Sequence, residues 1–186
     1  MKKNYFLIAV FAILLVSCNS KINVETYAEF QKKGNEISTL TQSVLLANVG
    51  QAMQAGGAVY AVEFCNLKAS NLVDSLNQVN NCVISRVSAK NRQSENGLKT
   101  DADQKLWAIF EAGTAKDTII QESKKLVYYK PIKIALPACL KCHGELGTDI
   151  DSATAEKLQN LYPADLATGY KLNDFRGLWK IEFAAN

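Results

Sequence analysis

The segment Cys139-Leu140-Lys141-Cys142-His143 has the residue types and the spacing with the greatest chemical potential in this chain. C-x-x-C-H is the attachment signature of a c-type haem. Two thiols separated by two residues add to the vinyl groups of one porphyrin, and the adjacent imidazole binds the iron as its proximal ligand. The pattern therefore predicts one covalently attached haem c, with thioethers from Cys139 and Cys142 and iron ligation by His143.

Two other sites use a similar motif, and both fit this sequence less well. A thioredoxin-like redox site also shows C-x-x-C, but it belongs after a strand in a βαβ pattern. A structural zinc site needs four ligands. The chain has no second C-x-x-C, and His143 is its only histidine.

The N-terminus has the features of a bacterial lipoprotein signal. Lys2 and Lys3 precede an uncharged apolar run over 5–16, which ends in the lipobox-like Leu15-Val16-Ser17-Cys18. Such a run has the length of a signal-peptide core rather than of a membrane span. We expect a signal peptide over 1–17, lipidation of Cys18, a tether over 18–26 and one haem-binding domain over 27–186. The alternative is an uncleaved membrane anchor.

Export and haem attachment support each other, because c-type haem is attached on the outer side of the bacterial inner membrane. The predicted location is the cell envelope, as a lipoprotein that faces the periplasm or lies in the outer membrane. The predicted partners are haem, a lipid bilayer through Cys18, and a redox or signalling protein. Loss of Lys2 and Lys3 lowers the formal net charge from +3 to +1. This balance argues against nucleic-acid binding.

The second axial ligand of the iron is left open by the residues alone. Without a second histidine, the candidates are Met53, Cys65 and an open site. On a continuous helix, Cys65 would point about 120° away from Met53, so both cannot face the iron. Three roles are open for Cys65 and Cys82: they form a disulfide, both are buried thiols, or one of them is a haem ligand.

The hydrophobic pattern predicts an α+β fold. Apolar residues at helical spacing indicate one or two helices over 27–76, with a kink or break at Gly56-Gly57. We expect a further helix over 102–113 and strands over 83–89, 125–136 and 175–183. In the last strand, apolar residues alternate with Arg176, Lys180 and Glu182, which is typical of a half-buried strand. The pattern favours an antiparallel sheet covered on one side.

From about Leu45 onward, the chain resembles a family of single-haem c-type proteins with a PAS-like fold, a domain of unknown function. The segments that carry this resemblance are AVEFCN (61–66), SRVS (85–88), YKPI (129–132), CLKCHG (139–144), YPADLATGY (162–170) and RG (176–177). The chain departs from the family at 92–96, where RQSEN replaces an Arg-Asn-Pro-x-Asn turn. The resemblance implies a PAS-like antiparallel sheet and identifies Cys65 as the distal ligand opposite His143.

Other residues are candidates for lining the haem pocket. Arg86 and Arg92 suit the haem propionates, because a guanidinium matches a carboxylate, although both also fit a solvated surface. Six aromatic residues fit either the pocket or the ordinary core: Trp107, Tyr128, Tyr129, Tyr162, Tyr170 and Trp179.

Three functions follow from these residues. The first is a monohaem protein that senses redox state or a small ligand, or carries electrons. Thiolate ligation by Cys65 would favour ferric iron and a ligand that can leave. The alternative is a haem enzyme of the peroxidase or nitrogen-oxide reductase type, which requires an openable iron site and a distal acid or base. The third is a structural subunit in which haem stabilises the fold.

Overall fold

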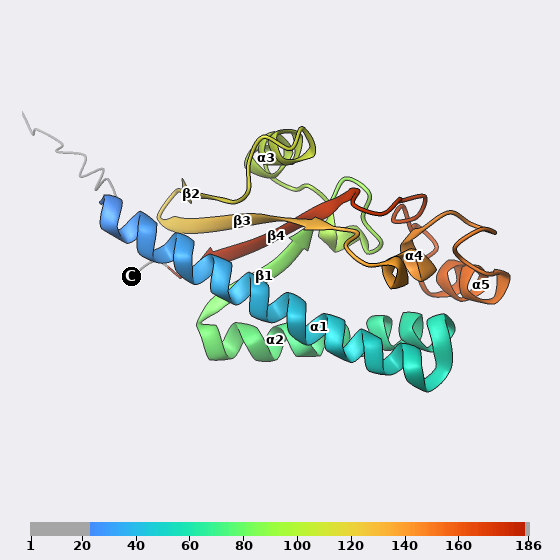
Figure 1. Cartoon of the computed structure of the whole chain (residues 1–186). Helices are drawn as coiled ribbons and strands as arrows, with labels where there is room; N and C mark the ends of the chain where they lie inside the picture. Colours follow the sequence, from blue (N-terminus) through green and yellow to red (C-terminus); the bar gives the residue numbers. More distant parts are fainter. Residues whose placement is uncertain (1–22, 185–186) are drawn as a thin grey trace, which may run out of the picture.

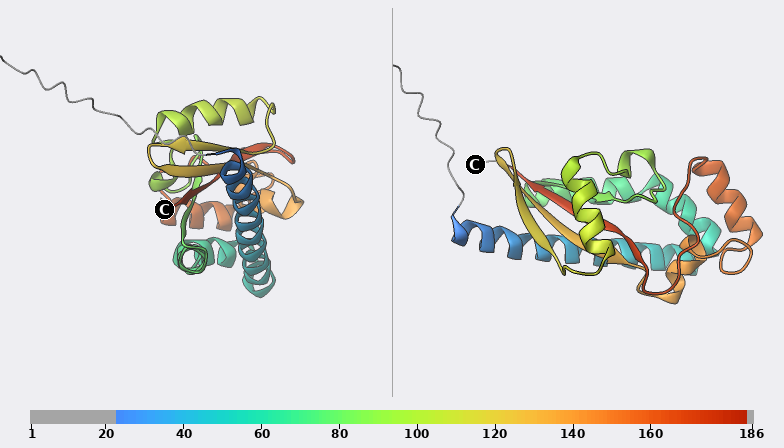
Figure 2. Two further views of the ribbon diagram at one scale, coloured as in Figure 1. Left: turned by 90° about the vertical axis from the view of Figure 1, so that its left-hand side faces the viewer. Right: turned by 90° about the horizontal axis from the view of Figure 1, so that it is seen from above.

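The computed structural model describes residues 23–184, so the predicted signal peptide and Cys18 lie outside the described residues. Within this range, a four-stranded sheet is sandwiched between helices on its two faces (Figures 1 and 2). Helices α1 and α2 cover one face and α3 covers the other. The α+β class and the long N-terminal helical region are therefore confirmed.

Helix α1 (Val24–Leu67) is two helices joined by a sharp break. It begins at Asn23, whose side chain accepts a hydrogen bond from the Thr26 N–H at 2.7 Å. The break is at Gly56 and Gly57, where Gly57 has φ 70°, a conformation that a residue without Cβ adopts readily. The chain doubles back here (Figure 1). The continuous helix assumed for comparing Met53 with Cys65 does not exist.

Helix α2 (Ala69–Asn80) continues the returning arm and ends at Asn81, which is left-handed with φ 49°. This turn leads directly into strand β1 (Cys82–Val87). Cys65 and Cys82 are both free thiols, so the disulfide considered from the sequence is not formed.

The sheet has the strand order β1-β4-β3-β2, and every neighbouring pair is antiparallel. Its other strands are β2 (Thr118–Glu122), β3 (Lys125–Lys133) and β4 (Phe175–Phe183). The sequence pattern identified β1, β3 and β4, but it missed β2, the short edge strand.

Both faces of the sheet are buried, which corrects the expectation of a sheet covered on one side. Tyr128 and Trp179 pack against α1 and α2 on one face. Tyr129 and Leu178 pack against α3 (Asp101–Glu111) on the other. The α1 face requires Gly34, because a Cβ there would collide with the ring of Tyr128.

Strand β4 is also buried on both faces, contrary to the half-buried strand expected from its alternation. Lys180 is 6% exposed, because its amino group lies 3.1 Å from the carboxylate of Asp103 on α3. A buried partner of opposite charge allows a lysine to occupy a position that the pattern assigned to solvent.

The remaining helices lie in the connections. They are the 3-10 turn η1 (Ser94–Asn96), α4 (Pro137–His143) and α5 (Ser152–Leu161). Helices α4 and α5 lie beyond the end of the sheet, beside the point where α1 turns back (Figures 1 and 2). The sequence pattern predicted neither helix. Among the described residues, no helix is long and apolar enough to cross a membrane.

Candidate functional site

Helix α4 carries the whole C-x-x-C-H motif. Pro137 opens the helix, where its missing N–H costs no hydrogen bond. Residues three and four positions apart share a helix face, so Cys139 lies on the same face as Cys142 and His143. Both cysteines are free thiols and half-buried.

The helix is held between two small apolar clusters. Cys139 packs against a cluster that includes Ala167 and Tyr170. Cys142 packs against another, which includes Val62 of α1 and Tyr162. Burial raises the pKa of Cys142 to about 11, so its sulfur is a neutral thiol at neutral pH.

The chain leaves α4 through Gly144, and this position requires a glycine. A Cβ there would lie 2.5 Å from the Cβ of Asp149, whose carboxylate accepts a hydrogen bond from the Glu145 N–H at 3.0 Å. The segment after the motif therefore folds back tightly on α4.

His143 is oriented by a backbone carbonyl. Its Nδ1 lies 2.8 Å from the carbonyl oxygen of Ala167, and the Tyr170 N–H donates to the His143 carbonyl at 2.9 Å. Burial and the charges of nearby arginines hold the pKa of His143 well below its ordinary value. A neutral imidazole that donates from Nδ1 keeps its lone pair on Nε2, which is the form that binds metals.

The structure brings Cys65 into the same region from the returning arm of α1. Burial raises the pKa of Cys65, and the charges of Arg86 and Arg92 partly oppose this effect. Its charge also acts on Cys142 of α4. Met53 is half-buried on the first arm of α1, three residues before the break at Gly56.

Three arginines gather around this site, and we call them the arginine cluster: Arg86, Arg92 and Arg176. All three lower the pKa of His143. Arg86 is exposed, yet it is sufficiently desolvated that its own pKa is lowered. Of the three, Arg92 forms a salt bridge, with Asp165 at 2.9 Å. The cluster therefore carries more positive than negative charge.

The arginines differ in how fully they are engaged. The Arg92 side chain contacts Asp165 and the Cys142 carbonyl. Arg176 donates to the Ser88 hydroxyl and the Lys90 carbonyl through one nitrogen, Nη1. Among residues 23–184, the Arg86 side chain has no hydrogen bond or salt bridge. Of the two arginines singled out in the sequence, Arg86 has no polar partner in this part of the chain, whereas Arg92 is engaged through Nε and Nη2.

The six aromatic candidates separate into two groups. Tyr162 and Tyr170 lie at the site: the Tyr170 ring centroid is 6.4 Å from that of His143, and the Arg92 guanidinium is 5.6 Å from the Tyr162 ring. The other four belong to the packing of the sheet and α3: Trp107, Tyr128, Tyr129 and Trp179.

The hydroxyl of Tyr170 is buried without a hydrogen-bond partner in the described part of the chain. Tyr170 is 5% exposed, and the Lys90 amino group lies 4.2 Å from its ring centroid. A buried hydroxyl without a partner is costly, so this atom points to a missing acceptor or donor.

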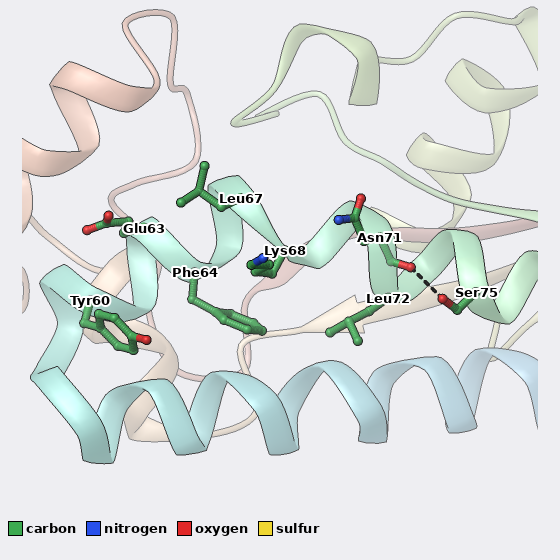
Figure 3. Close-up of a pocket in the computed structure, with 8 residues that line it drawn as sticks. All are labelled: Tyr60, Glu63, Phe64, Leu67, Lys68, Asn71, Leu72 and Ser75. Carbon is green, nitrogen blue, oxygen red and sulfur yellow. Dashed lines mark hydrogen bonds between the residues drawn. The ribbon is translucent and has the colours of Figure 1, made fainter.

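A separate open pocket of about 550 Å³ lies along the returning arm and α2 (Figure 3). Its lining follows helical spacing along α1 and α2 and includes Tyr60, Phe64, Leu67 and Leu72. Cys65 does not line it. Within residues 23–184, no three His, Cys, Asp or Glu side chains form a ligand set for a lone metal ion.

Cys82 lies away from this site. It is 8% exposed in the core between the sheet and the first two helices, and burial raises its pKa. Cys82 is therefore a buried thiol, which is one of the three alternatives considered from the sequence.

The sequence profile of the Tll0287-like family matches residues 17–184. The chain belongs to this family. No curated protein sequence matches it significantly. Among solved structures, it is similar to the crystal structure of the cyanobacterial heme-protein Tll0287, with a TM-score of 0.56 and 17% identity. That similarity covers 82% of this chain and 96% of the other, and it shows a shared fold.

Sequence reasoning assigned no role to three residues that the structure places at the site: Asp165, Ala167 and Arg176. The signal that they matter was present, because the segments 162–170 and 176–177 carry the family resemblance. Their roles depend on contacts with α4 and with the segment after β1, and spacing along the chain does not reveal these contacts.

Proposed function

We propose that this protein binds one haem c through thioethers from Cys139 and Cys142, with His143 as the proximal ligand and Cys65 as the distal ligand. Met53 is the alternative distal ligand. The observation that carries the proposal is the His143 imidazole, which is neutral and donates from Nδ1 to Ala167, leaving Nε2 free to bind.

The donor set of the site fits this group. Haem c needs two free thiols, a neutral imidazole and partners for two carboxylates. The two free thiols of α4 meet the first requirement. The excess positive charge of the arginine cluster and the unpartnered Tyr170 hydroxyl suit carboxylates. Arg86 has all of its donors free among the described residues, and Arg92 and Arg176 each keep some.

Attachment would use the thiols of Cys139 and Cys142 directly. Each S–H would add across a vinyl group, with the sulfur bonding one carbon and the hydrogen going to the other, so no oxidant would be required. Free thiols held on one helix face can reach two vinyl groups of the same ring.

We infer that the protein is a redox or small-ligand sensor, or an electron carrier. The bound haem supplies an iron that exchanges one electron and can take an external ligand. The Cys65 sulfur, as a thiolate, would favour the ferric state, and burial opposes its ionisation. If Cys65 were the distal ligand, its opposed ionisation would make it a ligand that can leave, which would suit a switch better than rapid electron relay.

We further propose that the protein is a lipoprotein of the bacterial cell envelope, anchored through Cys18 and acting with a redox or signalling partner. The support is the N-terminal sequence. Labelling with a radioactive fatty acid tests this. Wild-type protein should carry the label and Cys18→Ala should not, whereas a labelled Cys18→Ala would refute the anchor.

The ligation is tested by maturing the protein with haem and recording its ferric low-temperature EPR spectrum. Cys65→Ala should convert a low-spin thiolate-type signal to a high-spin or altered signal. Cys82→Ala is a matched control, because it removes a buried thiol away from the site. A wild-type spectrum in Cys65→Ala would move the assignment to Met53 or to an open site.

The haem itself is tested by haem staining after denaturing electrophoresis. Wild-type protein should stain, and the double variant Cys139→Ser/Cys142→Ser should not. Rapid turnover of peroxide by the wild-type protein would favour the enzyme alternative over a sensor or carrier.

A further inference from the structure

Arg92 joins the segment after β1 to the C-x-x-C-H helix. Its Nη2 donates to the carbonyl oxygen of Cys142 at 2.6 Å, and its Nε donates to the Oδ2 of Asp165 at 2.9 Å. One planar guanidinium thus holds two segments that are distant in the sequence, α4 and the loop 162–170. A guanidinium does this well because its donors are fixed in one plane.

Asp165 also contacts Ala167, the hydrogen-bond partner of His143. Its Oδ1 accepts a hydrogen bond from the Ala167 N–H at 2.7 Å, and the Ala167 carbonyl faces the His143 Nδ1 at 2.8 Å. Since Cys142 and His143 are adjacent, these four contacts close a ring. It runs from Arg92 through Asp165, Ala167 and His143 back to the carbonyl of Cys142.

The ring is shielded from solvent. The side chains of Arg92 and Asp165 are 13% and 9% exposed, so water screens their charges little. A second contact fixes the same segment, where the Leu166 N–H donates to the Asn91 carbonyl at 3.0 Å. The Ala167 carbonyl is therefore held rigidly opposite the imidazole.

We infer that Arg92 and Asp165 are positioning residues that set the orientation and the tautomer of the His143 imidazole. This inference rests on the proposed ligation by His143, although neither residue would touch the iron. A carbonyl that accepts from Nδ1 makes the imidazole a stronger donor, and such partners tune a bound metal. The pair would thereby favour ferric iron.

The test compares Arg92→Lys and Asp165→Asn with Lys125→Gln in haem-loaded protein. Lysine cannot donate to Cys142 and Asp165 from one planar group, and asparagine removes the negative charge. Lys125→Gln is a matched control, since it breaks the surface pair of Lys125 and Glu182. We expect both site variants to change the ferric EPR g values, and the ferric preference to fall about tenfold. For one electron, this raises the midpoint potential by about 59 mV.

A second measurement needs no haem. His143 is the only histidine, so nitrogen-15 NMR of untagged apoprotein shows a single imidazole. Wild-type and Lys125→Gln protein should hold the Nδ1–H tautomer, and the two site variants should show a mixture. If Arg92→Lys does not fold, Asp165→Asn alone decides the result.

Unchanged EPR, potential and tautomer in Asp165→Asn would overturn the inference. A wild-type protein that attaches no haem would instead refute the proposed function, and the tautomer measurement would still test the ring. The two failures are therefore distinguishable.

Discussion

Two buried polar clusters of this protein differ in how completely their groups are paired. Beneath α3, Asp103 accepts hydrogen bonds from the Tyr129 hydroxyl and the Lys180 amino group through Oδ1, at 2.9 and 3.1 Å. Its Oδ2 accepts from the backbone of Lys99 and Thr100. Around His143, by contrast, the arginine cluster has excess positive charge, and the Tyr170 hydroxyl has no partner within residues 23–184.

The comparison separates a structural cluster from a binding cluster. A buried network whose groups are all satisfied stabilises the fold and needs nothing further. A cluster with unpaired donors and unbalanced charge is costly until a ligand supplies the missing acceptors. By this criterion, the Asp103 cluster is complete in itself, and the arginine cluster fits the anionic group that we propose it binds.

The largest expected effect is on the complete cluster. Asp103→Ala removes the close partner of buried Lys180 and leaves only Glu182, whose carboxylate is 3.9 Å from the amino group. The free energy of unfolding of the apoprotein should therefore fall by about 3–5 kcal/mol. Chemical denaturation of both proteins measures this. A loss below about 1 kcal/mol would show that Lys180 reaches water or another partner easily. The Asp103 cluster would then not depend on each of its pairings.

Acid should weaken the same cluster. Burial alone would raise the pKa of Asp103, but hydrogen bonds from Lys180 and Tyr129 outweigh it and lower the pKa. The folded-state pKa therefore lies below the unfolded one. The stabilisation is present above the unfolded-state pKa and is lost as pH falls through the folded-state value. Unfolding curves of wild-type and Asp103→Asn protein should converge on acidification, and parallel curves would contradict this.

A pair of tyrosine variants should give opposite signs. Tyr129→Phe removes a hydrogen bond to Asp103 and should lower apoprotein stability by about 1–1.5 kcal/mol. Tyr170→Phe removes an unpartnered hydroxyl and should raise it by about 1 kcal/mol. Equal losses in the Tyr129→Phe and Tyr170→Phe variants would mean that the Tyr170 hydroxyl has a partner. One observation in favour of a binding site would then be lost.

A smaller effect is expected from the charge of the arginine cluster. Arg86→Gln should relieve repulsion and raise apoprotein stability by less than about 1 kcal/mol, and added salt should shrink the gain. Thermal melts at low and high ionic strength measure this difference. Destabilisation that does not depend on salt would indicate that Arg86 has a structural partner.

The smallest effect should come from the surface. Lys125 and Glu182 lie 3.2 Å apart, but Lys125 is 54% exposed. Lys125→Gln should change stability by less than about 0.5 kcal/mol, because water screens exposed pairs. A larger change would mean that this surface charge contributes substantially to the stability of the fold. Lys125→Gln would then not serve as a control.

Much of the fold was predictable from local pattern. Alternating apolar residues identified β1, β3 and β4, and the glycine pair marked the break in α1. The pattern missed α4, which is seven residues long, and it missed β2 at the edge of the sheet. Short elements carry too few periods for such a signal, and tertiary contacts determine them.

The burial of Lys180 shows a second limit of prediction from the sequence pattern. Alternation along β4 assigned this lysine to solvent, because the pattern records polarity but not partners. Only the packing of α3 across the sheet brings Asp103 to its amino group. The sheet is consequently covered on two faces rather than one.

The sequence by itself determined the chemistry of the motif. Two thiols and an imidazole at fixed spacing share a helix face wherever that helix is placed, since the spacing is a local property of the chain. Only the tertiary structure decided what surrounds them. Arg92 and Ala167 contact α4, and Cys65 lies near it; the three come from separate segments that meet only when the chain packs.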